Sequence, residues 1–143
     1  MVDDVVVNKA AIIERCVARV REVYSGDDRN LFEDVTRQDS IILNLQRACE
    51  AAIDLAMHVV RVRRLGVPQE TRQAFDLLRD AGLLPADSAE RMAHMVGFRN
   101  VAIHDYRTLN LDIVKAIVTA HLDDFQTFVA AMLRSEPQPN GAA

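Results

Sequence analysis

The fold is decided by residues 40–65, SIILNLQRACEAAIDLAMHVVRVRRL. Apolar side chains recur here every three or four residues, which is the spacing of one face of an α-helix. The stripe consists of Ile42, Leu45, Cys49, Ala52, Ile53, Ala56 and Val60. Asp39 or Ser40 is suited to cap the start of this helix, and Gly66 is suited to end it. We therefore predict one long helix from residue 39 or 40 to about residue 65.

The same spacing continues on both sides of this segment. It predicts further helices over residues 8–24, 69–81, 85 to about 104, and 111–134, with a loop or short irregular helix over 25–38. Pro68 and Pro85 are placed to begin the third and fourth helices, and Asn110 to cap the fifth. Short connections between such helices favour an antiparallel bundle. We therefore predict an all-α, five-helix domain.

This domain is expected to occupy residues 1–134. The segment 135–143 has no apolar content to bury and is predicted to be disordered. The second and fifth helices have wide apolar faces. Their apolar surface is larger than the core of one small bundle would bury, which favours a homodimer. Cys16 and Cys49 fall at apolar helix positions, and buried free thiols are expected there rather than a disulfide.

Composition limits the classes of function. No run approaches the roughly 18 apolar residues that span a bilayer, so no contact with a membrane is expected. The first residues include Asp3 and Asp4, where a signal peptide would be basic, so a soluble cytoplasmic protein is expected. No HExxH pattern and no glycine-rich phosphate loop occurs. These patterns predict neither a metal site nor a bound cofactor.

The charge distribution allows two interpretations. The net charge of −4 is unlike that of most nucleic-acid-binding domains, which carry a basic surplus. However, 15 of the 17 basic residues are arginine, the side chain that binds phosphate with two parallel hydrogen bonds. This preference either serves phosphate recognition or reflects a G+C-rich genome, and composition does not separate the two.

The strongest concentration of chemistry lies in residues 99–106, RNVAIHDY, an Arg-x4-His-x-Tyr pattern near a predicted helix end. Arginine holds a phosphodiester and keeps its charge, and histidine exchanges a proton near neutral pH. On a straight helix Arg99 and His104 point about 140° apart, whereas Asn100 and His104 share a face. The long Arg99 side chain must therefore swing round for the three groups to meet in one cleft.

Such a cluster suits RNA cleavage without a metal ion. A base takes the proton of a ribose 2′-hydroxyl, the oxygen attacks the phosphorus, and a cation stabilises the charge that develops. His104 would be the acid or base, Arg99 the stabilising cation, and Asn100 an orienting partner. Tyr106 could position the phosphate or His104. The alternative is a surface arginine and a histidine that is hydrogen-bonded by Asp105 or a backbone carbonyl.

Residues 99–106 resemble the Arg-x4-His-x-Tyr signature of the HEPN superfamily, in its HepT-like branch. Residues 39–51 resemble the second-helix signature of that branch, and residues 109–114 and 121–125 also fit. The resemblance implies a toxin of a bacterial toxin–antitoxin pair. Such toxins are five-helix bundles that dimerise, bring two Arg-x4-His segments to a shared cleft and cut RNA without metal.

The resemblance also implies a partner and residue roles. The partner is a minimal nucleotidyltransferase that neutralises the toxin by attaching AMP to the motif tyrosine, here Tyr106. Arg99 and His104 match the catalytic pair, and Asn100 matches the polar residue that follows the arginine. Adenylate on Tyr106 would place bulk and negative charge beside Arg99 and compete with RNA phosphate.

Several other polar residues are weaker candidates. The family pattern makes Asp39, Asn44 or Glu50 a candidate lining of the cleft, although for Asp39 we favour the role of helix cap. His58 and His121 lie beside apolar helix faces. They are expected to be packing residues whose hydrogen bonds are made within the protein.

Three readings compete with a ribonuclease toxin. The chain could be a non-catalytic helical protein that binds a nucleotide or the nucleotidyltransferase. The roles could be reversed, with the nucleotidyltransferase as the toxic partner and this chain restraining it. Finally, Arg99 and His104 could only satisfy a dimer interface, in which case neither would affect an activity.

Overall fold

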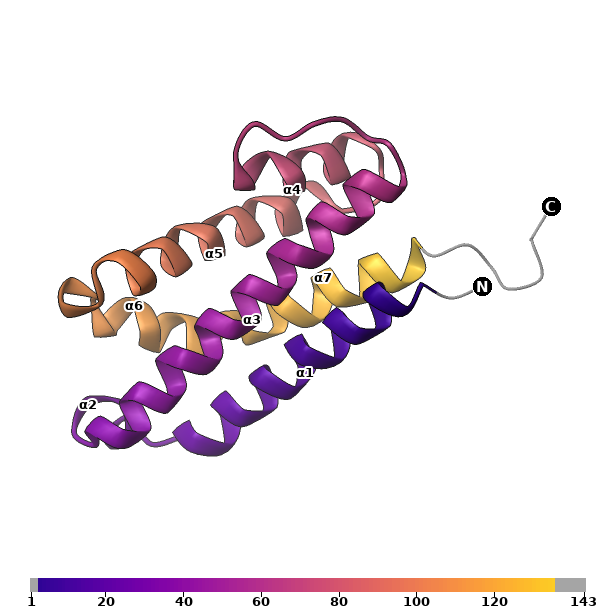
Figure 1. Ribbon diagram of the computed structural model, residues 1–143. Coiled ribbons are helices and arrows are strands. Elements are labelled where there is room, and N and C mark those ends of the chain that lie inside the picture. Colours follow the sequence, from indigo (N-terminus) through magenta and orange to yellow (C-terminus); the bar gives the residue numbers. More distant parts are fainter. Residues whose placement is uncertain (1–2, 136–143) are drawn as a thin grey trace.

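The computed structural model describes residues 3–135, and in that range the chain is a bundle of helices without a strand (Figure 1). Four long helices form the bundle: α1 (Asp4–Tyr24), α3 (Val35–Val62), α5 (Ala86–His104) and α7 (Leu122–Arg134). The shorter elements are α2 (Arg29–Phe32), α4 (Thr71–Asp80), the 3-10 turn η1 (Tyr106–Thr108), α6 (Leu111–Ala116) and the π-helical turn η2 (Ile117–His121). The all-α prediction is confirmed. None of the described helices is long and apolar enough to cross a bilayer.

The long helix α3 runs through the centre of the bundle and packs along α1 (Figure 1). Its buried small residues are Ala48, Ala51, Ala52 and Ala56, which let neighbouring helices approach closely. Phe75 of α4 meets Phe128 of α7 edge to face, with ring centroids 5.5 Å apart. Cys16 and Cys49 are buried and free, as predicted.

The start of α3 differs from the prediction. The helix begins at Val35 and is capped by Asp34, whose carboxylate accepts a hydrogen bond from the Arg37 amide at 3.1 Å. Asp39 and Ser40 therefore lie inside the helix, and the prediction that either of them caps it is wrong. The first turn escaped detection because Val35 is 68% exposed, so no buried apolar residue marks that turn.

The ends of the helices also shift by a few residues. α3 ends at Val62, before Gly66, and Arg64 takes the left-handed conformation with φ 56°. Pro68 does not begin α4, which starts at Thr71. Pro85 stands immediately before α5 rather than as its first residue.

The predicted fifth helix is present but interrupted. Its cap is confirmed, because the Asn110 side chain accepts a hydrogen bond from the Asp112 amide at 2.8 Å. The π-helical turn η2 then separates α6 from α7. The tail predicted to be disordered lies, from residue 136 onward, outside the described residues.

Candidate functional site

The Arg-x4-His-x-Tyr segment occupies the last turns of α5 and the 3-10 turn η1. The helix ends at His104, because Asp105 leaves helical geometry with φ −150° and ψ 53°. η1 is closed by a hydrogen bond from the Thr108 amide to the Asp105 carbonyl at 3.0 Å. The backbone therefore turns between His104 and Tyr106, so these two side chains leave different elements.

Arg99 points from α5 toward α3. Its Nε lies 3.5 Å from Oε1 of Glu50, and the Arg99 side chain is only 18% exposed. The same Nε is buried and makes no hydrogen bond to any described residue. An ion pair with Glu50 therefore holds the guanidinium in place while leaving this N–H without an acceptor.

Asn100 and His104 are both exposed on the outer side of α5. Neither makes a side-chain hydrogen bond or an ion pair within residues 3–135. The alternative in which Asp105 or a carbonyl satisfies His104 is thus not seen in the described structure. The imidazole is therefore exposed and unbonded within the described residues.

Tyr106 reaches back from η1 to α3. Its hydroxyl donates a hydrogen bond to Oδ1 of Asp39 at 2.5 Å, and the residue is 42% exposed. Partial burial, the hydrogen bond to Asp39 and the negative charge of Asp39 together raise the pKa of Tyr106 to about 12. The phenol is therefore held neutral, with its proton directed at a carboxylate.

The Arg-x4-His-x-Tyr segment lies within the part of the chain that matches a known protein family. The family described as "Ribonuclease HepT-like" matches residues 13–132. The chain belongs to the HepT-like family. The "mRNA nuclease HepT" of Shewanella oneidensis is 48% identical over 127 residues, which cover 89% of this chain and 95% of that protein.

Solved structures agree with this assignment. One is the tri-AMPylated Shewanella oneidensis HEPN toxin in complex with its MNT antitoxin, with TM-score 0.87, 46% identity, and coverage of 93% of this chain and 99% of that chain. A second is a toxin–antitoxin complex with AMP-PNP, with TM-score 0.88, 45% identity, and coverage of 93% of this chain and 100% of that chain. This HepT-like chain therefore has relatives of known structure that align over nearly its whole length.

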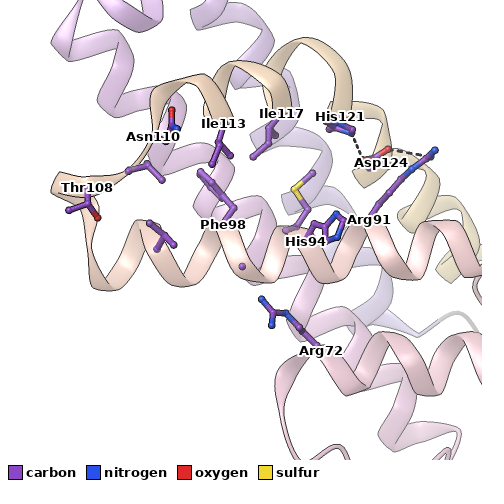
Figure 2. A pocket seen from close by; sticks show the side chains of 14 residues that line it. Arg72, Arg91, His94, Phe98, Thr108, Asn110, Ile113, Ile117, His121 and Asp124 are labelled. Atoms are coloured by element: carbon purple, nitrogen blue, oxygen red, sulfur yellow. Dashed lines mark hydrogen bonds and ion pairs between the residues drawn. The ribbon is translucent and has the colours of Figure 1, made fainter.

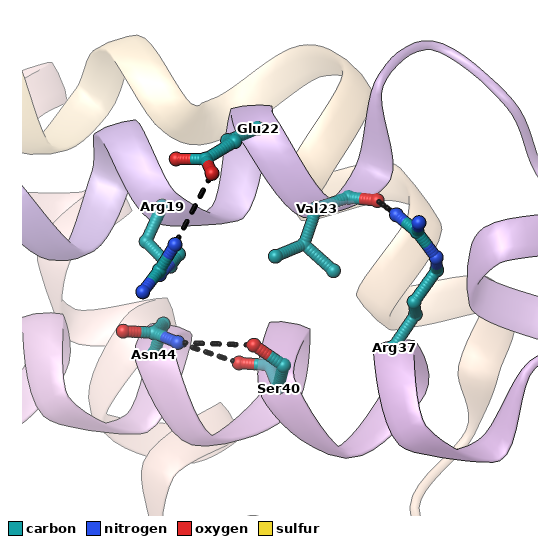
Figure 3. A network of polar contacts seen from close by, with 6 residues as sticks. All are labelled: Arg19, Glu22, Val23, Arg37, Ser40 and Asn44. Atoms are coloured by element: carbon teal, nitrogen blue, oxygen red, sulfur yellow. Dashed lines mark hydrogen bonds and ion pairs between the residues drawn. The ribbon is translucent and has the colours of Figure 1, made fainter.

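Two of the three weaker candidates on α3 lie beside the motif, and the third does not. Asp39 contacts Tyr106 and Glu50 contacts Arg99. These two positions are eleven residues apart, which brings them within about 20° of each other around the helix. Asn44 points about 140° away from Asp39. It bonds to the Ser40 carbonyl at 2.8 Å on the side of α3 that faces Arg19 of α1 (Figure 3).

An open groove runs beside the motif in this HepT-like chain, between α5 and the segment α6–η2–α7 (Figure 2). Its volume is about 640 Å³. The apolar side chains that line it are Met95, Phe98, Val101, Leu109, Ile113 and Ile117. Val101 lies between Arg99 and His104 on α5, so the groove adjoins the motif. The sequence pattern missed this groove because its lining comes from several elements between α4 and α7.

Two further histidines, His58 and His121, have local partners. His58 bonds through Nε2 to Asp3 at 2.5 Å, and its side chain is only 11% exposed, which fits the expected packing role. His121 bonds through Nδ1 to Asp124 at 3.0 Å at the far end of the groove, and its side chain is 46% exposed. No group of three metal-binding side chains lies close enough to hold an ion within residues 3–135.

Proposed function

We propose that this chain is the toxin of a bacterial toxin–antitoxin pair and an endoribonuclease that needs no metal ion. The observation that carries the proposal is the motif at the end of α5: an exposed His104 that has no side-chain partner within residues 3–135, and an Arg99, five residues earlier, that Glu50 holds in place. A chain 48% identical to an mRNA nuclease supports RNA as the substrate. The site of action is then the cytoplasm, where cellular RNA is found.

The chemistry needs a base, an acid and a cation. The base takes the proton of the 2′-hydroxyl, and the freed oxygen forms a bond to the adjacent phosphorus. The bond to the 5′-oxygen breaks, and the acid protonates that oxygen as it leaves. His104 exchanges the protons, Arg99 stabilises the charge on the phosphoryl oxygens, and the exposed Asn100 amide orients the phosphate. Tyr106 lines the same end of α5.

One motif supplies only one imidazole for these two proton transfers. We therefore propose a homodimer in which a second copy brings its own His104 and Arg99 to the same cleft. The apolar groove between α5 and α6 is the surface that this copy covers, because Val101 and Ile113 leave 40% and 52% of their area exposed there. The groove adjoins the motif, so a two-fold contact along it brings the two motifs together.

The antitoxin in this proposal is a minimal nucleotidyltransferase that attaches AMP to Tyr106. Support comes from the related HEPN toxin, which is tri-AMPylated in its complex with an MNT antitoxin. Tyr106 is 42% exposed as a residue and follows His104 by two positions. Each added adenylate brings a negative charge near Arg99, where it competes with RNA phosphate.

The test is cleavage of total cellular RNA by the purified chain in EDTA, without its partner and with Tyr106 shown by mass spectrometry to be unmodified. Wild type and the control Arg63→Ala, an exposed arginine at the end of α3 that does not line the groove, are expected to give discrete products. His104→Ala and Arg99→Ala should give none, while circular dichroism shows unchanged helix content. Loss of helix content in either variant would make that residue structural.

The competing functions give different results. A wild-type chain that is unmodified and binds RNA without cutting it is a binding protein. Growth inhibition by the nucleotidyltransferase alone, relieved by this chain, would reverse the roles of the two proteins. Expressing each protein singly in the same host separates these cases.

A further inference from the structure

Asp39 is placed for a reaction rather than for helix capping. It lies on the second turn of α3, is exposed, and accepts the Tyr106 hydroxyl hydrogen bond at 2.5 Å. No cation pairs with its carboxylate among the described residues. A carboxylate that is neither neutralised by a cation nor committed to a helix end is able to accept a proton.

The phenol of Tyr106 needs such a group. A tyrosine attacks phosphorus through its oxygen lone pair, and this oxygen is a strong nucleophile only as its proton leaves. With the pKa of Tyr106 raised to about 12, only about one molecule in 10⁵ carries the phenolate at pH 7. Transfer to Tyr106 at neutral pH therefore depends on a base that takes the proton during the attack.

We propose that Asp39 is the base that takes the phenolic proton of Tyr106 while an adenylyl group is transferred to it. The inference rests on the proposed function, because it assumes that Tyr106 is the modified residue. The toxin would then supply part of the machinery for its own neutralisation, and the nucleotidyltransferase would supply the nucleotide.

Atoms and electrons balance in this step. Oη of Tyr106 forms a bond to the α-phosphorus of a nucleoside triphosphate. The bond from that phosphorus to the oxygen bridging to the β-phosphate breaks, and pyrophosphate leaves with the electron pair. The phenolic proton moves to Oδ1 of Asp39, which is exposed and returns it to solvent.

The test compares Asp39→Asn with wild type. Asparagine keeps an oxygen that accepts the Tyr106 hydrogen bond, but it cannot take the proton. The control is Asp54→Asn, another exposed carboxylate on α3, which pairs with Lys9 instead. The unmodified chains are incubated with ATP, Mg²⁺ and the MNT antitoxin of the related Shewanella oneidensis HEPN toxin. The initial rate of AMP addition to Tyr106 is then followed by intact mass and peptide mapping between pH 6 and pH 9.

We expect Asp39→Asn to lower the rate of AMP transfer at pH 7 by about 100-fold or more, the usual contribution of a general base. Its rate should rise about tenfold per pH unit, because hydroxide must now remove the proton, whereas the wild-type rate should stay nearly flat. Asp54→Asn should match wild type. The affinity of each chain for the nucleotidyltransferase is measured alongside and should not change.

An Asp39→Asn rate equal to that of wild type, or a fall explained by weaker docking, overturns the inference. So does a lower rate with an unchanged pH profile, because that result makes Asp39 a positioning residue only. RNA cleavage by the unmodified chains separates this failure from failure of the proposed function. If wild type cuts RNA and Asp39→Asn is modified normally, only the role of Asp39 is lost. If wild type receives no AMP on Tyr106, both this inference and the proposed neutralisation fail.

Discussion

Replacing Ile113 with alanine should weaken the proposed homodimer about 30-fold. Ile113 lies on α6, faces Phe98 across the groove, and is 52% exposed in the single chain (Figure 2). Burying a whole isoleucine side chain is worth about 3 kcal/mol, so covering the exposed half is worth about 1.5 kcal/mol. The alanine side chain keeps about a third of this contribution, so each copy loses about 1 kcal/mol of binding free energy. A two-fold interface contains the residue twice, and about 2 kcal/mol corresponds to about 30-fold in Kd.

Sedimentation equilibrium gives the dimer Kd, and RNA cleavage at several protein concentrations gives its effect on activity. The concentration for half-maximal cleavage should rise by the same factor as Kd, while the rate at saturating protein stays unchanged. The control is Val67→Ala, a highly exposed residue in the loop after α3 (81%) that lies away from the groove. An unchanged Kd for Ile113→Ala would refute the placement of the second copy. Cleavage that stays proportional to protein concentration in the monomeric range would refute the need for a dimer.

Three further predictions concern stability and reactivity. Asn110→Ala removes the side chain that caps α6 and should lower the free energy of unfolding in urea by about 1 kcal/mol, whereas Asn110→Ser should restore most of it. The hydrogen bond from His58 lowers the pKa of the Asp3 carboxyl below its usual 3.8, so its stabilisation is present above about pH 4 and is lost as pH falls through the lowered pKa. Wild type and Asp3→Asn should therefore converge in stability between pH 4 and pH 2 in urea titrations, and a constant difference would contradict this. Burial raises the pKa of the Cys16 and Cys49 thiols, so iodoacetamide at pH 8 should label neither thiol in the native protein and both in urea. Labelling of either thiol in the native protein would contradict this prediction.

Apolar spacing identified the helices because buried positions on one face repeat every three to four residues. It failed where that signal is missing or ambiguous. The first turn of α3, which Asp34 caps, carries the exposed Val35 and no buried apolar residue, so its sequence does not indicate a helix. The π-helical turn was missed because Val114, Val118 and Leu122 also fit a regular α-helix.

The chemistry of the motif could be predicted from its residue types, but its surroundings could not. The eleven-residue spacing of Asp39 and Glu50 places both on one face of α3, and that relation is present in the sequence. Which face of α3 meets α5 depends on packing between helices that are far apart in the chain. The turn of η1, which carries Tyr106 back to α3, is equally a result of tertiary structure.

The acidic surroundings of the motif bear on how an RNA substrate is held. Glu50 lies 3.5 Å from Arg99 and Asp39 contacts Tyr106, so the site is not a basic patch of the kind that binds RNA through many phosphates. A carboxylate that fixes an arginine lowers its affinity for phosphate but saves the entropy of ordering the side chain when substrate arrives. Such a site is suited to stabilising the charge of the transition state at one phosphate rather than to holding a long RNA. The net charge of −4 is therefore compatible with the proposed cleavage, because in the proposed homodimer two copies of Arg99 would meet one scissile phosphate without a basic surplus elsewhere.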